Sequence, residues 1–246
     1  MTELAQPLSS PTTGPAGLEL RAQALDAALR AASPAEVIAA ALREIGRDKL
    51  ALVSSFGTES AALLKVMADV DSAIPVVFLD TGWLFEETLA YRDTLTATLG
   101  LRDVRSIRPL DTDLDRDDVS RELWFSDPDK CCLIRKVEPL RRALAPFDGW
   151  INGRKRFQGG ARADIPVVEA DGARLKFNPF ANVTPADISA IYATARLPQH
   201  PLLAAGFLSV GCMPCTSRAE VGEDARAGRW RGRGKTECGI HTTKTS

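Results

Sequence analysis

The stretch KLALVSSFGTES, residues 49–60, decides the fold class of this chain. Residues 49–55 form a short apolar run, which is typical of a buried strand. Gly57 lies in the turn that follows, and apolar residues recur with helical spacing over residues 58–70. A strand, a glycine-bearing turn and a helix in this order are the unit from which open parallel sheets are built.

The same alternation continues along the chain. Strands that alternate with helices predict an α/β fold, a mostly parallel, twisted, Rossmann-like sheet with right-handed crossovers and flanking helices. The further strands are predicted at residues 74–79, 103–107 and 149–151, with a hairpin at 167–177. The further helices are predicted at residues 18–31, 34–45, 85–99, 131–144 (interrupted by Pro139) and 185–195.

Three segments depart from this pattern. Residues 1–16 are rich in Ser, Thr, Pro and Gly, and we expect a disordered lead. Residues 111–118 carry five aspartates and are expected to form a solvated loop. Residues 211–246 are rich in Gly, Arg and Cys, and we expect a functional or flexible tail that is hardly core. Residues 17–246 are therefore expected to form one domain, with its core at about 47–210.

Composition restricts the class of protein and its partners. The 246 residues carry a net charge of −1, which gives no sign of a nucleic-acid or membrane partner. The longest apolar run, near residues 201–210, is too short to cross a bilayer, and residues 1–10 lack the basic start of a signal peptide. We therefore expect a cytoplasmic protein, monomeric or homo-oligomeric, in which free or metal-bound thiols are more common than disulfides.

Four of the five cysteines form two pairs, Cys131-Cys132 and Cys212-Met-Pro-Cys215. A Cys-x-x-Cys turn presents two sulfurs on one side of a loop and commonly holds half of a zinc site or an iron–sulfur cluster. Adjacent cysteines reach one centre only if that centre is large, and a cubane cluster is larger than one zinc ion. The alternative is a set of unrelated buried thiols beside a redox Cys-x-x-Cys.

Two polar turns follow neighbouring strands. The first contains Gly57, and the helix after it offers unpaired N–H groups to an anion, with hydroxyls from Ser54, Ser55 and Ser60. It lacks the Gly-Lys-Ser/Thr of a Walker loop, and an ordinary serine-capped turn is the alternative. The second turn is Leu79-Asp80-Thr81-Gly82. Both turns lie at the carboxyl ends of strands, where nucleotides bind in such sheets, although Asp80 could instead cap the next helix.

The C-terminal segment combines cations with the fifth cysteine, Cys238. Nearby cations favour the thiolate, so a nucleophile that meets an anionic substrate is one interpretation, and a solvated basic tail is the other. His241 belongs to that site or is a free side chain, whereas His200, between prolines, is expected to be structural. The basic residues before Cys238 are Arg226, Arg229, Arg231, Arg233 and Lys235.

These motifs together resemble a known family. SFGTES at residues 55–60 is similar to the modified PP-loop of the adenylylsulfate and phosphoadenylylsulfate reductases, whose fold is adenine nucleotide alpha-hydrolase-like. Phe56 and Glu59 depart from the Ser-Gly-Gly-x-Asp-Ser of ATP pyrophosphatases, which disfavours ATP cleavage. The resemblance extends over about residues 50–241, and its other motifs are LDTG (79–82), WING (150–153), GRW (228–230) and ECGIH (237–241).

The resemblance assigns roles to the cysteines. Family members with both cysteine pairs resemble the assimilatory adenosine 5′-phosphosulfate (APS) reductases that carry a 4Fe–4S cluster. Cys131, Cys132, Cys212 and Cys215 would then hold the cluster, with zinc as a minor alternative. Lys136 matches a lysine that lies between cluster and substrate in the family, one helical turn from Cys132.

The implied reaction is the thioredoxin-dependent reduction of APS to sulfite and AMP, in sulfate assimilation and cysteine biosynthesis. The alternatives are a reductase of 3′-phosphoadenosine 5′-phosphosulfate (PAPS), for which the basic residues 154–156 could bind the 3′-phosphate, an ATP pyrophosphatase, or a non-enzymatic iron–sulfur redox module. The implied catalytic residues are Cys238, which would form an S-sulfonate, Lys136 and His241. The implied substrate-binding residues are Ser54, Ser55, Phe56, Gly57, Ser60, Leu79, Thr81, Gly82, Arg226 and Arg229.

Overall fold

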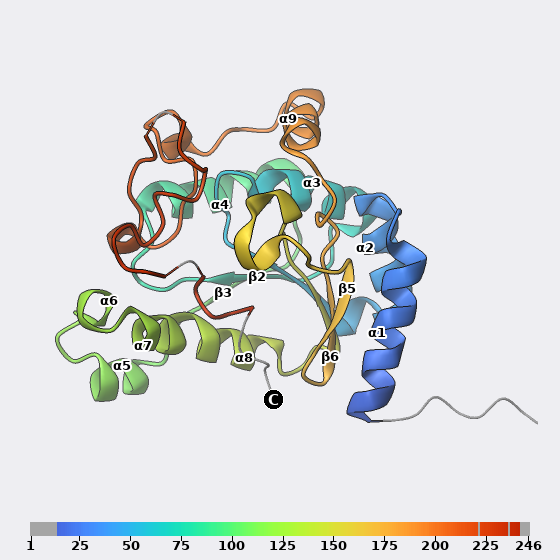
Figure 1. Cartoon of the computed structure of the whole chain (residues 1–246), viewed down its shortest axis with the longest axis horizontal. Helices are drawn as coiled ribbons and strands as arrows, with labels where there is room; N and C mark the ends of the chain where they lie inside the picture. Colours follow the sequence, from blue (N-terminus) through green and yellow to red (C-terminus); the bar gives the residue numbers. More distant parts are fainter. Residues whose placement is uncertain (1–13, 221, 236, 242–246) are drawn as a thin grey trace, which may run out of the picture.

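Six strands form one sheet at the centre of the protein, in the order β3-β2-β1-β4-β6-β5 (Figure 1). The computed structural model describes residues 14–220, 222–235 and 237–241. All neighbouring strands run parallel except β5, which pairs antiparallel with β6. The strands are β1 (Leu50–Ser54), β2 (Val76–Leu79), β3 (Val104–Ile107), β4 (Gly149–Ile151), β5 (Val168–Asp171) and β6 (Arg174–Phe177).

The strand order reverses at β1. From β1 the chain adds β2 and β3 on one side, and later β4 and β6 on the other. In sheets of this kind a crevice opens at the carboxyl edge where the order reverses. The predicted α/β fold with a mostly parallel sheet is confirmed, and the turn after β1 lies at the reversal.

Alternate residues of β1 pack on opposite faces of the sheet, because successive side chains of a strand point to opposite sides. Leu50 and Leu52 belong to the larger apolar core, whereas Ala51 packs in a second core with Leu140 and Leu144. Helices α2, α3 and α4 cover the first face, and α5–α8 lie on the second (Figure 1). The helices are α1 (Pro15–Leu29), α2 (Pro34–Ile45), α3 (Ser60–Asp71), α4 (Glu86–Leu99), α5 (Asp111–Asp117), α6 (Leu123–Ser126), α7 (Pro128–Cys132), α8 (Glu138–Leu144) and α9 (Pro185–Thr194).

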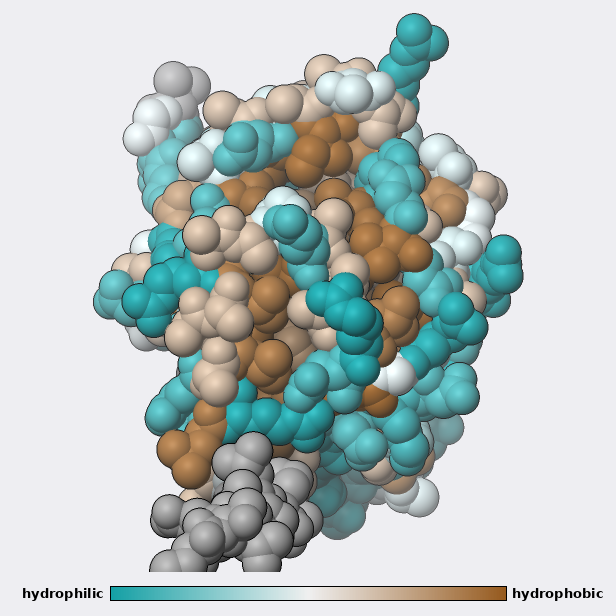
Figure 2. Space-filling model, turned by 90° about the vertical axis from the view of Figure 1, so that its right-hand side faces the viewer, coloured by the Kyte–Doolittle hydropathy of each residue, from teal (hydrophilic) through white to brown (hydrophobic). Residues whose placement is uncertain are grey.

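Helix α1 packs along β5 at the edge of the sheet. The carboxylate of Asp26 accepts hydrogen bonds from the N–H groups of Val167 and Val168, at 2.6 and 3.3 Å. Figure 2 shows this side of the molecule, with hydrophobic residues along its middle and mostly hydrophilic residues at its margins. Within the described ranges, every helix falls short of the length and hydropathy of a membrane span.

Two expected boundaries differ from the structure. Helix α1 begins at Pro15, so residues 15 and 16 of the expected disordered lead are helical, while residues 1–13 lie outside the described residues. Residues 111–118 were expected to form a loop, and that prediction is wrong for α5. Leu114 is buried there, and Asp111 and Asp113 lie in the first turn, where the helix dipole favours negative charge.

The helix predicted at residues 131–144 is continuous in the structure, but part of it is π-helical and not α-helical. Helix α7 ends at Cys132, and a π-helical turn η2 (Leu133–Val137) joins it to α8. The Glu138 N–H bonds to the Leu133 carbonyl, five residues back. Pro139 has no N–H to donate and lies in the first turn of α8, where none is needed. The extra residue in this turn decides where the side chains that follow Cys132 point.

Candidate active site

A cavity of about 230 Å³ opens at the carboxyl edge of the sheet, where the strand order reverses. The turns after β1, β2 and β4 line it, together with residues 209–212 and the C-terminal segment. Of the predicted site residues, it brings together Ser54, Ser55, Gly57, Ser60, Leu79, Thr81, Lys136, Arg226, Arg229, Cys238 and His241. Phe56 and Gly82 are not part of this lining.

The turn after β1 is held rigidly against the cavity. The Phe56 N–H donates to Ser54 Oγ at 3.1 Å, and Thr58 Oγ1 donates to the Leu208 carbonyl at 2.8 Å. Phe56 has a φ of 48°, and its side chain is fully buried, edge-on to Phe78 at 5.4 Å between centroids. The left-handed backbone thus turns the phenyl ring into the core. Phe56 supports the turn from the side of the core, and its side chain does not reach the cavity.

The turn after β2 is organised by its own side chains. Asp80 accepts a hydrogen bond from the Gly82 N–H at 3.1 Å and forms an ion pair with Arg108 at 2.8 Å. Thr81 Oγ1 lies 3.2 Å from Cys212 Sγ and faces the cavity. Asp80 therefore acts on its own turn, while Thr81 connects the nucleotide-side turn to one of the cysteine pairs.

The segment after residue 211 has a small core of its own, although it was expected to be hardly core. Trp230 is 3% exposed and packs with Cys212 and Cys215. The Trp230 N–H bonds to the Cys215 carbonyl at 3.0 Å, and the Ser217 N–H bonds to the Gly228 carbonyl at 2.8 Å. These contacts fold the segment back toward the sheet (Figure 1), and residues near its end line the cavity.

Cys238 is half-buried and lines the cavity with Lys136 and Arg229. The preceding residue, Glu237, forms a two-point ion pair with Arg162, with N–O distances of 2.5 and 2.8 Å. A thiol in this position, beside cations and the anion-binding turn, can act as a nucleophile toward a bound anionic substrate.

Lys136 lies on the boundary between the cavity and the cysteine pairs. Its Nζ is 5.8 Å from the centre of the Trp230 ring. Burial lowers the pKa of Lys136, but negative charge on the thiols of Cys212, Cys238 and Cys132 outweighs this and raises the pKa above its usual value. Lys136 is therefore a permanent cation at neutral pH.

The two cysteine pairs line a second, smaller cavity of about 10 Å³ that adjoins the first. Cys131, Cys132, Cys212 and Cys215 are all buried and none is in a disulfide. Burial raises the pKa of Cys131 to about 12. Burial also opposes ionisation of Cys212, but Lys136 and the Thr81 hydroxyl lower its pKa overall. In the described part of the chain, no three or more histidine, cysteine or carboxylate side chains surround a position for a single metal ion.

Arg135 joins the cysteine cavity to the turn after β2, and sequence reasoning missed it. It is 4% exposed; its guanidinium pairs with Asp118 at 2.6 Å and donates to the Thr81 carbonyl at 2.9 Å. It also lies over the Trp83 ring, at 5.4 Å. No signal in the sequence distinguishes the roles of Arg135 and Lys136, since both are cations on the same predicted helix and only the fold shows what each one contacts.

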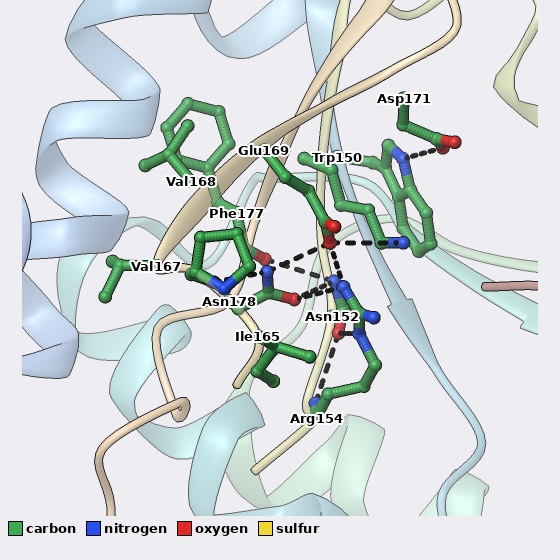
Figure 3. A network of polar contacts seen from close by, with 12 residues as sticks. Trp150, Asn152, Arg154, Ile165, Val167, Val168, Glu169, Asp171, Phe177 and Asn178 are labelled. Carbon is green, nitrogen blue, oxygen red and sulfur yellow. Dashed lines mark hydrogen bonds and ion pairs between the residues drawn. The ribbon is translucent and has the colours of Figure 1, made fainter. Parts of the chain in front are cut away.

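Two of the basic residues after β4, Arg154 and Lys155, have carboxylate partners, and Figure 3 shows the contacts of Arg154. Arg154 pairs with Glu169 and donates to Asn152 Oδ1 at 3.2 Å, while Lys155 pairs with Glu59 at 2.8 Å. Both cations are buried and line the cavity. Burial lowers the pKa of each, and the carboxylate partners oppose this effect.

The two histidines have different surroundings. His241 stacks on Trp150, with 5.8 Å between centroids and 1° between the planes, and burial lowers its pKa well below the usual value. His241 is therefore neutral at working pH and closes one wall of the cavity. His200 lies outside the cavity lining, 1% exposed, with Nε2 3.1 Å from Thr88 Oγ1 and Nδ1 accepting from the Leu202 N–H. These contacts agree with a structural role.

Comparison with known proteins shows which family has this sequence and fold. The sequence model of the phosphoadenosine phosphosulfate reductase domain matches residues 49–218. This chain belongs to the phosphoadenosine phosphosulfate reductase family. An adenosine 5′-phosphosulfate reductase of Mesorhizobium japonicum is 49% identical to this family member over 225 residues, covering 92% of this chain and 89% of the relative. A phosphoadenosine 5′-phosphosulfate reductase of Gloeobacter violaceus is 43% identical over 214 residues, 85% and 88% of the two chains.

Solved structures agree with the fold of this family. The crystal structure of a phosphoadenylyl-sulfate reductase from Candida auris superposes with a TM-score of 0.67, at 22% identity, over 83% of this chain and 98% of that one. The FMN adenylyltransferase of Candida glabrata superposes with a TM-score of 0.52 at 11% identity, over 80% and 70% of the two chains, which shows a shared fold alone. The family match ends at residue 218, and the structure places these residues beyond it at the cavity: Arg226, Arg229, Trp230, Glu237, Cys238, Ile240 and His241.

Proposed function

We propose that this protein reduces APS to sulfite and AMP in sulfate assimilation and cysteine biosynthesis, using an external dithiol such as thioredoxin. The observation that carries the proposal is the position of Cys238, on the same cavity as the turn after β1 and beside Lys136 and Arg229. APS reductases at 49% and 46% identity support this substrate. The proposal places the enzyme in the cytoplasm, where dithiol reductants operate.

The cavity offers separate places to the two parts of APS. The adenosine would lie near Leu79 and Thr81, and the phosphosulfate near the turn after β1. Helix α3 begins at Ser60, so its unpaired N–H groups and dipole favour an anion at this position. Lys136, Arg226 and Arg229 would neutralise the phosphate and sulfate oxygens, for which guanidinium groups are well suited.

The first step is nucleophilic transfer of the sulfonate group. The Cys238 thiolate attacks the sulfate sulfur, an S–S bond forms, and the bond from sulfur to the phosphate oxygen breaks, so AMP leaves with that oxygen. The cations count most as charge moves to this oxygen, because fixed positive groups stabilise the transition state more than the ground state. His241, neutral and stacked on Trp150, would bound the site and hold the segment that carries Cys238.

The second step releases sulfite. One thiolate of the external dithiol attacks Cys238 Sγ, sulfite leaves, and a mixed disulfide forms. The second thiol of the reductant then attacks its own mixed disulfide and frees Cys238. The two electrons that convert sulfate sulfur to sulfite sulfur thus come from the dithiol, which ends as a disulfide.

We further propose that Cys131, Cys132, Cys212 and Cys215 hold a 4Fe–4S cluster. The donor set is entirely sulfur, as such clusters require, and in a cubane each thiolate binds a different iron, so the thiols need not converge on one point. The lining also has two buried donors without a hydrogen-bond acceptor among the described residues, Trp83 Nε1 and Arg135 Nε, and cluster sulfides could accept from them. When bound, the cluster would supply a fixed charged centre beside Lys136.

PAPS reduction is the second candidate, since the Gloeobacter relative carries that name. The substrates differ by a 3′-phosphate, which would need a cation whose charge is available. Arg154 and Lys155 line the cavity but pair with Glu169 and Glu59, and Arg156 donates instead to the Ile165 carbonyl outside the lining. The pairing of these cations favours APS.

The deciding experiment measures sulfite release by anaerobically purified protein with thioredoxin, comparing APS and PAPS at equal concentration. Iron content and visible absorbance are read on the same sample. We expect a brown protein that strongly prefers APS. A preference for PAPS would transfer the function to the second candidate. An intact cluster with no sulfite from either substrate would contradict both and favour a non-enzymatic iron–sulfur module, while pyrophosphate release from ATP would favour an ATP pyrophosphatase.

A further inference from the structure

Among the described residues that line the cation-rich cavity, Glu237 is one of two carboxylates, and the other, Glu59, pairs with Lys155. Glu237 lies directly before Cys238, and its side chain is 15% exposed. Its carboxylate meets Arg162 at 2.5 and 2.8 Å and Arg226 at 3.5 Å. Arg162 comes from the turn after β4, so this contact joins segments 75 residues apart in sequence.

The pair fixes the direction in which Cys238 points. Side chains of neighbouring residues in non-helical backbone diverge, so a carboxylate held against Arg162 directs the next side chain away from it. Gly239, on the other side, has a φ of 88°, and a Cβ there would approach Val137 Cγ2 at 3.5 Å. Cys238 thus lies between an anchored carboxylate and a turn that favours glycine, which leaves its sulfur few orientations.

The same carboxylate offsets positive charge at the cavity. Arg162 and Arg226 both line it, and Glu237 lies between them. Burial raises the pKa of Glu237, but the two arginines lower it overall, so the group is ionised at neutral pH. Without this charge, two guanidinium groups would face the substrate with less compensation, and an anion would bind at least as tightly.

We propose that Glu237 is a positioning residue whose ion pair with Arg162 aims Cys238 at the bound substrate, at some expense of substrate affinity. This role rests on the proposed function, because it assumes that Cys238 is the nucleophile. The two members of the pair have different effects. The positive charge of Arg162 attracts the anionic substrate, and the contact of Glu237 with Arg162 fixes the orientation of the Cys238 thiol.

The test replaces Glu237 by glutamine, which keeps the shape and removes the charge. In Glu237→Gln we expect single-turnover S-sulfonation with APS to slow about 10- to 100-fold, because small misplacements of a reacting group cost this much. KM for APS should stay constant or fall. Glu223→Gln is the matched control, since Glu223 pairs with Arg231 at 2.6 and 2.9 Å in the same segment, outside the cavity lining. It should change neither quantity.

A second readout is independent of turnover. Iodoacetamide labelling of Cys238 in substrate-free protein, quantified on its peptide by mass spectrometry, should accelerate several-fold in Glu237→Gln and Arg162→Gln but not in Glu223→Gln. The double variant should add little to either single one, because both remove the same contact. Unchanged labelling, or a rise in KM that accounts for the lost activity, would overturn the proposal. Faster labelling in a protein whose wild type releases no sulfite would support the anchor and reject the proposed function.

Discussion

The sheet and the C-terminal segment are stabilised by different forces. The central strands are held by apolar side chains with no exposed surface, among them Leu50, Leu52 and Ile151. Among the described residues after 211, one small cluster forms around Trp230, and Ile240 packs against the second core of the sheet. Ion pairs provide many of the other attachments. These pairs are Arg162–Glu237, Arg226–Glu237, Lys235–Asp129 and Arg231–Glu223.

Because of this difference, the sheet and the C-terminal segment have different roles. Burial of apolar surface is the main source of folding free energy and does not depend on the ligand. Exposed ion pairs such as Arg231–Glu223 and Lys235–Asp129 contribute about 0–1 kcal/mol each and weaken with salt, so they add little stability of their own. The sheet therefore provides most of the stability and the turns that bind the nucleotide, while the segment that carries Cys238 is attached largely by polar contacts.

Replacing Cys238 by serine should have the largest effect. We expect sulfite release to fall at least about a thousandfold, because a hydroxyl is a far weaker nucleophile than a thiolate. Iron content, AMP binding and the free energy of unfolding should stay unchanged, since Cys238 belongs to the segment and not to the sheet. Sulfite assays with calorimetric AMP titration check this, and retained turnover would reject Cys238 as the nucleophile.

Leu52→Ala tests the opposite region. Leu52 has no exposed surface and pairs in register with Val76 and Ile151. Its truncation should cost about 2–5 kcal/mol of unfolding free energy, measured by urea titration, because it leaves a cavity in the main core. Leu20→Ala is the control: Leu20 is 62% exposed, and its loss should cost below about 0.5 kcal/mol. A similar small cost for Leu52 would contradict the division described above.

Gly228→Ala should separate the two regions most clearly. A Cβ at Gly228 would lie 2.1 Å from the Ser217 carbonyl oxygen, so the backbone hydrogen bond that folds the segment back would break. We expect turnover to fall about 10- to 100-fold through misplacement of Cys238, with urea unfolding of the sheet nearly unchanged. Ala225→Ser, at an exposed position nearby, should be neutral. A large loss of overall stability in Gly228→Ala would show that the segment folds as part of the sheet.

At neutral pH His200 should give the smallest effect, and it concerns stability alone. Burial lowers its pKa to about 4, although Glu87 opposes this. Between that value and the unfolded pKa of about 6.5 the unfolded chain binds more protons, so stability falls as pH falls, by up to about 1.4 kcal/mol per pH unit. Relative to wild type, His200→Gln should lose this slope between pH 6.5 and 4 in urea titrations. If the unfolding free energies of wild type and His200→Gln changed with pH in the same way, the lowered pKa of His200 would be contradicted.

The sheet could be predicted from the sequence because its signals are local. Apolar runs predict the strands, and Gly57 predicts the turn that follows β1. Most of the predicted catalytic and substrate-binding residues line the cavity, since parallel strands end at one edge and the motifs resemble a known family. Phe56 was an exception, because the left-handed backbone that buries its ring is not visible in the residue types.

The contacts of the C-terminal segment were not predictable for a physical reason. Arg162 and Glu237 are ordinary charged residues in irregular segments, and only the fold brings them together. Arg135 directly precedes Lys136, and adjacent residues of a helix point in different directions, so one reaches Thr81 and the other the cavity. Long-range pairs and local changes of helical winding leave no periodic pattern in a sequence.

The contact between α1 and the outermost strand has a consequence for solubility. A strand at the border of a sheet exposes N–H groups that can pair with another chain and start aggregation. In this protein Asp26 accepts hydrogen bonds from Val167 and Val168 beside β5, and the helix lies along the strand. The family match begins at residue 49, so a fragment cut there would keep all six strands and lose this cover. Helix α1 thus covers an edge of the sheet at which another chain could otherwise pair, a role separate from the chemistry at the opposite end of the sequence.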